Sequence, residues 1–294
     1  MRSRFGGIAC LLLILSITAD RAEGQDDSKS PAEQYQALLK EYQRAGGSGR
    51  ALTDEERLQF VGQVYKRRHE LAVRFLELAE RHPDDSIAVD ALMQATWQVN
   101  TTPWPVELVG EDTASGRALA VLERDYMHSS KLGQVCLRIS HGFRGEYEPF
   151  LRAVLETSPH RDVHGMACLG LAHYLNLRGQ RLDLIHEQPA LAGEFAGLYG
   201  ADYLKELQRQ DRAKATSEME SLFERAAKEY GDMTAGDGGG GTVGEKAAAE
   251  LFEVRHLLVG RPAPEIEGRD QDGREFKLSD YRGKVVLLDF WSEA

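Results

Sequence analysis

A single acidic side chain, Asp289, lies inside an otherwise apolar run near the end of the sequence, VVLLDFW. An unbroken run of β-branched residues and leucine is typical of a central β-strand covered on both faces. A carboxyl group in such a strand has a perturbed environment, and its structural reading is a desolvated residue paired with a lysine. The structural reading of Trp291 is a packing residue in a core, because aromatic residues dominate core area. Both are candidate site residues, and the predicted strand 285–290 must position them.

The residues before this strand predict a β-hairpin. Two extended pieces, EIEGRD and REFKL, flank Asp272 and Gly273. An Asp-Gly pair between extended segments is among the strongest local hairpin signals. The polar stretch SDYRG then forms a tight connection to the strand.

Three motifs in this segment occur in a characteristic order: GRPAPEI, then DGREFKLSDYRGK, then VVLLDFW. Together they resemble the opening third of the thioredoxin-like redoxins, which include the alkyl hydroperoxide reductase/thiol-specific antioxidant (AhpC/TSA) domains and exported thiol-disulfide oxidoreductases. The resemblance covers residues 259–294, about an eighth of the chain. It implies a thioredoxin-like α/β domain, incomplete in this sequence, that acts on protein thiols and disulfides or on peroxides.

The resemblance also implies roles for individual residues. In the family the strand is followed by a pattern FW-x-x-WC-x-x-C, whose first cysteine lies at a helix N-terminus, where the helix dipole stabilises the thiolate. Counting from Trp291, the residues up to Ala294 fill the intervening places, so the nucleophile would come next. Asp289 takes the place of the carboxylate that assists proton transfer at the second cysteine. Trp291 takes the place of the tryptophan that lines the site.

The sequence as given therefore lacks the catalytic cysteine, and we expect it to be inactive in thiol exchange. Three origins suit this ending: a fragment, a disrupted gene, or an in-frame UGA codon for selenocysteine read as a stop. We further expect residues 260–294 to fold poorly in isolation, because an uncovered apolar strand is an aggregation hazard.

The N-terminal residues have the three-part layout of a secretory signal peptide. Two arginines precede the apolar run IACLLLILSITA, and small residues follow it, which predicts a signal peptide over residues 1–24 and a periplasmic or secreted protein. The alternative is an uncleaved membrane anchor. Cleavage removes three arginines, one aspartate and one glutamate, so the net charge changes from −11 to −12. Such an acidic protein is a poor partner for nucleic acid.

Residues 25–230 predict an α-helical domain, with helices over about 31–45, 53–82, 86–99, 114–127, 130–142, 146–157, 160–177, 193–209 and 211–230. We expect an irregular bundle, or an array that weakly resembles tetratricopeptide repeats and binds protein. The glycine-rich segment 231–244 predicts a flexible linker, and residues 245–258 a connecting helix. Fold class is thus mainly α. A non-enzymatic helical adaptor with a vestigial redoxin segment is the alternative function.

Cysteine and histidine residues elsewhere carry weaker signals. Cys136 and Cys168 are too far apart for a CxxC pair, and both lie in apolar helical sequence, which favours buried thiols over a disulfide. His160 and His164 share a helical spacing but lack a third metal ligand. The glycine-rich segment departs from a phosphate loop at Glu245, where lysine is needed. No cofactor and no metal are therefore predicted.

Overall fold

The structure is a computed structural model that describes residues 29–45, 54–96, 113–236, 240–258 and 260–290. Helices make up most of it, as the sequence predicted. The helices of the described residues are α1 (Pro31–Ala45), α2 (Asp54–Arg81), α3 (Ile87–Thr96), α4 (Ala114–Asp125), α5 (Leu132–Ile139), α6 (Tyr147–Thr157), α7 (Arg161–Glu187), α8 (Leu191–Tyr199), α9 (Ala201–Arg209), α10 (Arg212–Tyr230) and α11 (Val243–His256). The fold class of a mainly α protein is confirmed.

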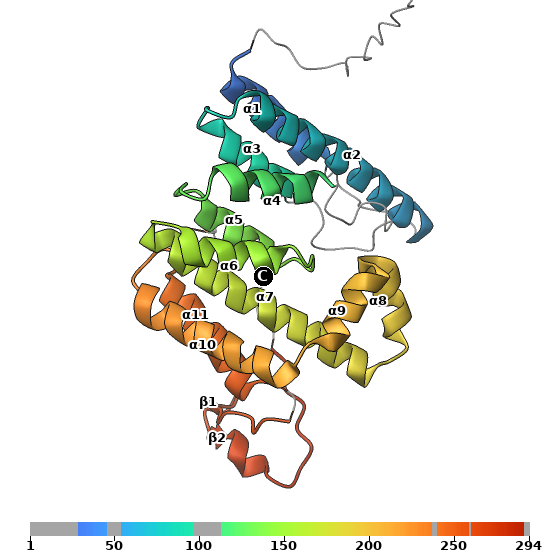
Figure 1. Cartoon of the computed structure of the whole chain (residues 1–294). Coiled ribbons are helices and arrows are strands. Elements are labelled where there is room, and N and C mark those ends of the chain that lie inside the picture. The colour runs from blue at the N-terminus through green and yellow to red at the C-terminus, as the bar shows by residue number, and fades with distance from the viewer. Residues whose placement is uncertain (1–28, 46–53, 97–112, 237–239, 259, 291–294) are drawn as a thin grey trace, which may run out of the picture.

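Helices α1 to α7 follow one another along the molecule, α10 and α11 continue beyond α7, and α8 and α9 lie to one side (Figure 1). Helix α7 packs against α5 and α6 on one side and against α10 on the other, and α11 packs on α10. One continuous hydrophobic core runs from Tyr35 in α1 to Val254 in α11. A smaller cluster, Leu182, Ile185 and Leu207, joins the end of α7 to α9.

Close helix packing around α7 requires a residue without a side chain. A Cβ atom on Gly170 would lie 2.9 Å from the backbone oxygen of Cys136 on α5. This separation is shorter than real Cβ contacts allow, so glycine sets how closely α5 and α7 approach.

Two predicted helices have different bounds in the structure. The predicted helix 193–209 is two helices, α8 and α9, because Gly200 between them has a φ of 90° that breaks the helical backbone. The predicted helix 160–177 continues to Glu187 in α7, through Gly179. Packing of α7 against its neighbours compensates for the low helix propensity of glycine.

The glycine-rich segment 231–244 is more ordered at both flanks than a flexible linker. Thr234 pairs with Thr242 in an antiparallel bridge, and the backbone N–H of Val243 donates to Met233 O at 2.8 Å. Ala235 and Val243 are fully buried in the core. The described flanks therefore form a packed connection that folds α11 back onto α10.

Helix α11 begins with a capping box. The hydroxyl of Thr242 accepts from the N–H of Glu245, and the carboxylate of Glu245 accepts from the N–H of Thr242. This exchange satisfies donors at the helix N-terminus. The carboxylate at this N-terminus also opposes the binding of a phosphate there.

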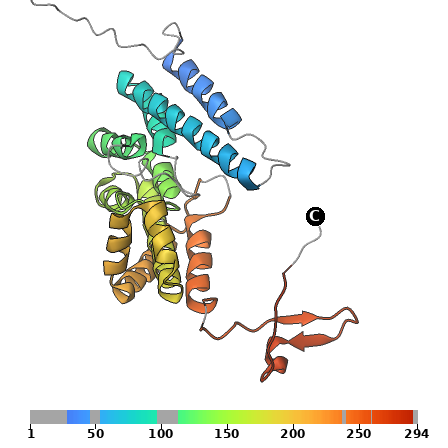
Figure 2. The same ribbon diagram turned by 90° about the vertical axis from the view of Figure 1, so that its right-hand side faces the viewer.

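The C-terminal segment holds the strands of the described residues, β1 (Glu267–Arg269) and β2 (Glu275–Lys277), which pair antiparallel. A short 3-10 helix, η2 (Leu278–Tyr281), follows them. Figure 2 shows this segment standing away from the helical body, on the side where α11 lies. Neither hydrophobic cluster of the described residues includes a residue beyond 258.

The strand predicted over residues 285–290 is not formed in the structure. These residues carry no strand assignment, and Val285 and Leu287 are almost fully exposed. A β-strand needs a hydrogen-bonded neighbour, and no described residue pairs with this run. The apolar composition of the run predicted a central β-strand, but the described residues contain no neighbouring strand with which it could pair.

None of the helices in the described part of the chain has the length and apolar character that crossing a bilayer requires. The predicted signal peptide, residues 1–24, lies outside the described residues.

Candidate functional site

The C-terminal hairpin turns at the residues that the sequence predicted. Gly273 has a φ of 77°, a backbone conformation that favours glycine, and its N–H donates to Asp270 O at 2.9 Å. The carboxylate of Asp270 accepts from the N–H groups of Asp272 at 2.9 Å and Arg274 at 2.8 Å. The turn is thus stabilised by its own side chain, in the way Asp commonly stabilises turns.

Pairs of opposite charge fix the register of the two strands. Glu267 lies opposite Lys277, and Arg269 lies opposite Glu275, with an ion pair in each case. Between them Gly268 lies opposite Phe276, whose ring would be 3.0 Å from a Cβ atom on the glycine. The hairpin therefore packs the aromatic ring across its own backbone instead of onto the helices.

Glu265 connects the start of the hairpin to η2. Its carboxylate accepts from the N–H of Ser279 at 2.9 Å. Hydrogen bonds from the Ser279 side chain, first, and from the Ser279 N–H lower the pKa of Glu265. Next to it, the N–H of Leu278 donates to Ile266 O at 2.9 Å. Hydrogen bonds therefore join the hairpin and η2 into one small unit, which directly precedes the apolar run that begins at residue 285.

Asp289 lies on the exposed part of this segment, at the end of the run 285–290. Trp291 lies outside the described residues. Among the described residues, Asp289 makes no hydrogen bond or ion pair with a side chain. The roles of Asp289 and Trp291 remain predictions from the resemblance.

The two cysteines of the helical domain are free and buried, and they form no disulfide with each other. Cys136 lies on α5, and burial raises the pKa of its thiol. Cys168 lies on α7, where its Sγ donates to Leu222 O at 3.2 Å and burial raises its pKa to about 11. At neutral pH both residues are protonated, and thiols are poor nucleophiles compared with thiolates. The prediction of buried thiols is confirmed.

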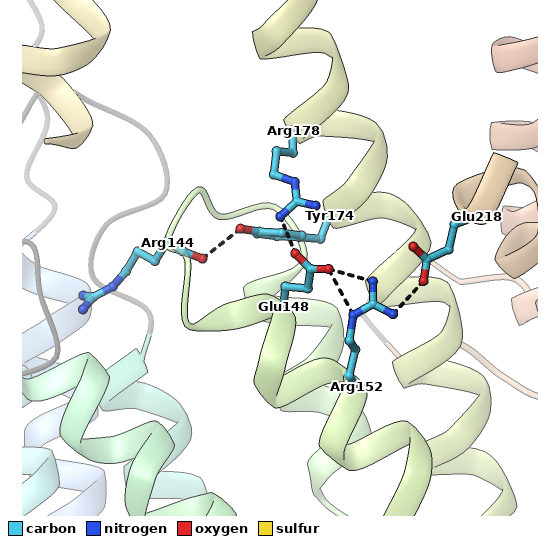
Figure 3. A network of polar contacts seen from close by, with 6 residues as sticks. All are labelled: Arg144, Glu148, Arg152, Tyr174, Arg178 and Glu218. Carbon is cyan, nitrogen blue, oxygen red and sulfur yellow. Dashed lines mark hydrogen bonds and ion pairs between the residues drawn. The ribbon is translucent and has the colours of Figure 1, made fainter. Parts of the chain in front are cut away.

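A polar network joins three helices at the centre of the bundle (Figure 3). Glu148 on α6 accepts from Arg152 at 2.7 Å and from Arg178 on α7. Arg152 also donates to Glu218 on α10 at 2.6 Å. These interactions lower the pKa of Glu218, chiefly through the hydrogen bond from Arg152. Each of the two glutamates and two arginines has a partner of opposite charge within the network. The network therefore connects α6, α7 and α10.

Tyr174 lies beneath this network and is fully buried. The guanidinium of Arg178 lies 5.5 Å from the centre of the Tyr174 ring, and the tyrosine hydroxyl donates to Arg144 O at 2.9 Å (Figure 3). Burial raises the pKa of Tyr174, which keeps its hydroxyl protonated. Its hydroxyl and ring therefore serve the packing of the bundle.

A cavity of about 230 Å³ lies beside the network, between α7 and α9. Its lining residues are Gly145, Glu148, Tyr174, Arg178, Tyr203, Glu206, Leu207, Arg209 and Gln210. The wall carries two glutamates and two arginines, so it favours neither an anion nor a cation.

The histidines singled out in the sequence lie at the start of α7. The ring of His160 contacts His128 O at 2.9 Å, and His164 follows one turn later. Within the described ranges, no group of three or more His, Cys, Asp or Glu side chains is arranged to hold a metal ion.

Sequence reasoning missed the network around Glu148 and Arg152. Their spacing of four residues on one helix is a signal for a local ion pair. The partner Glu218 lies 66 residues further on, and nothing in the local pattern indicates that contact.

Comparison with known proteins identifies the C-terminal segment. Residues 259–294 match the AhpC/TSA family. The thiol-disulfide oxidoreductase ResA of Geobacillus thermodenitrificans (strain NG80-2) is 49% identical over 39 residues, which cover 13% of this chain and 22% of that protein. The chain thus spans about a fifth of the length of the relative that it matches. No solved structure matches the chain significantly.

The resemblance to the thioredoxin-like redoxins is confirmed by these matches. Residues 259–294 are similar in sequence to the AhpC/TSA family and to one thiol-disulfide oxidoreductase. The matched residues include the hairpin, η2 and the apolar run that contains Asp289.

Proposed function

We propose that this chain belongs to an exported thiol-disulfide oxidoreductase, or to a peroxiredoxin-like antioxidant protein, with a helical domain before the redoxin domain. The observation that carries the proposal is the match of residues 259–294 to the AhpC/TSA family, in a segment that folds into the hairpin its motifs predict. The N-terminal apolar run and its flanks support export to the periplasm or the exterior.

The chemistry requires a sulfur or selenium nucleophile after residue 294. No cysteine follows Cys168 in the sequence, and the two described thiols are buried in the helical domain. In the proposed reaction the nucleophile attacks a substrate disulfide, and one substrate sulfur leaves as a thiolate that takes up a proton. A second cysteine then attacks the mixed disulfide, which releases the other substrate thiol and leaves the enzyme oxidised. An external thiol reductant returns the enzyme to its dithiol form.

In this scheme Asp289 accepts the proton of the second cysteine, and Trp291 lines the site. Asp289 is exposed in the structure. The proposed role therefore needs the run 285–290 to form a strand inside a sheet that places Asp289 next to the second cysteine.

A thiol-reduction assay tests the proposal. The protein is produced from its natural reading frame, including any codons after that of Ala294, and its reduction of a disulfide substrate by dithiothreitol is measured. A variant with serine at the nucleophile position is the matched control. We expect catalysis by the first protein and loss of catalysis in the control. Equal rates for the two proteins would overturn the proposal and favour the helical adaptor.

A further inference from the structure

The cavity of about 230 Å³ beside the polar network lies wholly within the helical body. Its lining residues fall between positions 145 and 210, on α6, α7, α9 and the turns next to them. The segment that resembles the redoxins therefore takes no part in forming it. Sites for drug-sized ligands have volumes of roughly 300–1,000 Å³, so this cavity fits a smaller molecule.

Charged side chains in the cavity wall form a paired set and an unpaired set. Glu148 and Arg178 form an ion pair with each other (Figure 3). Glu206 and Arg209 are exposed residues of α9, and neither makes a hydrogen bond or an ion pair with a described residue. The unpaired set therefore consists of one carboxylate and one guanidinium.

Glu206 and Arg209 are three residues apart on one helix, a spacing that brings side chains of opposite charge together. On the same helix Asp202 and Lys205 have this spacing and form an ion pair of 2.9 Å. The carboxylate of Glu206 lies instead towards the connection between α5 and α6, where a Cβ atom on Gly145 would be 3.2 Å from its Oε2. The acid therefore lies at the edge of the cavity without pairing with Arg209.

The side-chain amide of Gln210 adds an uncharged group to the cavity wall. Both its oxygen and its nitrogen are buried and have no hydrogen-bond partner among the described residues, and the same holds for Nε of Arg178. Buried polar groups in proteins nearly always have a partner, so these atoms mark a place where a ligand can supply one. A carboxamide offers donors and an acceptor together, and therefore pairs well with another carboxamide.

Contact between a ligand and these buried atoms requires a small outward movement of α9. The helix is attached to α7 through the small cluster of Leu182, Ile185 and Leu207, which is separate from the main core. Leu207 is the buried residue of α9. An element held by few buried apolar contacts opens at low cost in free energy. The movable wall of the cavity is thus the one that carries the unpaired charges.

We propose that the cavity binds a small zwitterion of the free amino-acid kind. Its ammonium group pairs with Glu206 and its carboxylate pairs with Arg209, so both wall charges gain a partner at once. An anion or a cation alone would pair with one charge and be repelled by the other. The amide of Gln210 favours an amino acid with a carboxamide side chain, such as glutamine. This ligand-binding function of the helical domain goes beyond the proposed thiol chemistry.

An NMR chemical-shift titration of the isotope-labelled, 294-residue chain with L-glutamine tests the site. We expect saturable shifts of the Gln210 side-chain amide and of the α9 backbone amides, with a Kd of about 1 mM or tighter. N-acetyl-L-glutamine lacks the ammonium group, and L-glutamine amide lacks the carboxylate. Each should bind at least about tenfold more weakly, because one charge-assisted hydrogen bond is lost.

Two substitutions on α9 test the charged contacts. Glu206→Gln and Arg209→Gln should each weaken L-glutamine binding at least about tenfold. Both residues are exposed, so the fold should be preserved. The matched control Asp202→Asn changes an acid on the same helix that pairs with Lys205 and does not line the cavity, and it should leave the Kd unchanged.

Three results would overturn the site. The first is the absence of saturable shifts up to about 10 mM L-glutamine. The second is equal binding of L-glutamine and its two derivatives, and the third is an unchanged Kd in either the Glu206 or the Arg209 variant. None of these readouts depends on catalysis, so their failure is distinguishable from failure of the proposed function.

Discussion

Arg152 on α6 donates a hydrogen bond of 2.6 Å to Glu218 on α10, across 66 residues of sequence. The same guanidinium donates to Glu148, which also binds Arg178 on α7. The two acids and two bases thus link the three helices that form the centre of the molecule (Figure 3). Glu148 is the member of this network that contacts both arginines.

Replacing Glu148 with alanine should lower the free energy of unfolding by about 2 kcal/mol, because two largely covered guanidinium groups lose their shared acceptor. Urea unfolding followed by circular dichroism measures this change. The control Asp125→Ala breaks an ion pair with Arg124 on the surface and should leave the unfolding midpoint unchanged. Equal effects of the two substitutions would show that the network contributes no more to the free energy of unfolding than a surface ion pair does.

The close approach of α5 and α7 should make Gly170 sensitive to the smallest side chain. Gly170→Ala forces a Cβ atom against the backbone oxygen of Cys136, and overpacking of this kind costs about 1–3 kcal/mol. Gly193→Ala on α8 is the matched control, because a Cβ atom there meets nothing within 4 Å. The control should be as stable as the parent or slightly more stable, because alanine has the higher helix propensity. Thermal unfolding of both variants measures these changes. A Gly170→Ala variant as stable as the Gly193→Ala variant would show that the close contact with Cys136 does not limit the size of residue 170.

Apolar periodicity predicted most helices, and the Asp-Gly pair predicted the turn at Asp272 and Gly273, because both are local features of the chain. The break at Gly200 was missed, since glycine tolerates a helical conformation as well as the φ of 90° seen here. The order of residues 231–236 and 240–244 was missed because it depends on the pairing of Thr234 with Thr242 and on burial of Val243. Composition describes neither contact.

The site residues show the same limit. Asp289 was identified from its place in an apolar run, but the surroundings of its carboxyl group depend on a neighbouring strand and covering helices. The contact of Arg152 with Glu218 likewise depends on how α6 and α10 pack. Local pattern therefore gives candidate residues only, and tertiary contacts decide the environment of each side chain.

His173 should make the stability of the helical domain depend on pH. Burial, with the neighbouring His141 and Arg181, lowers the pKa of His173 from 6.5 to about 4. The unfolded chain therefore binds a proton more readily than the folded chain between these values. Stability from this group is complete above pH 6.5 and is lost as the pH falls towards 4, by up to about 3 kcal/mol.

The variant His173→Asn separates this effect from other titrations. Between about pH 7.5 and about pH 4.5, the free energy of unfolding of this variant should change less than that of the parent chain. Urea unfolding of both proteins at pH values about one unit apart measures the difference. A parallel dependence in the two proteins would contradict the assignment. An NMR titration in which the His173 ring signals move near pH 6.5 would also contradict it.

The central claim is that the apolar run ending at Phe290 leads to a redox nucleophile, and the nucleotide sequence after the codon of Ala294 tests it most directly. We predict an in-frame codon for cysteine, or a UGA codon followed by further in-frame codons, with a cysteine codon about three positions later. A natural reading frame that encodes no such pair would contradict the account and leave a helical protein with a redoxin-like hairpin.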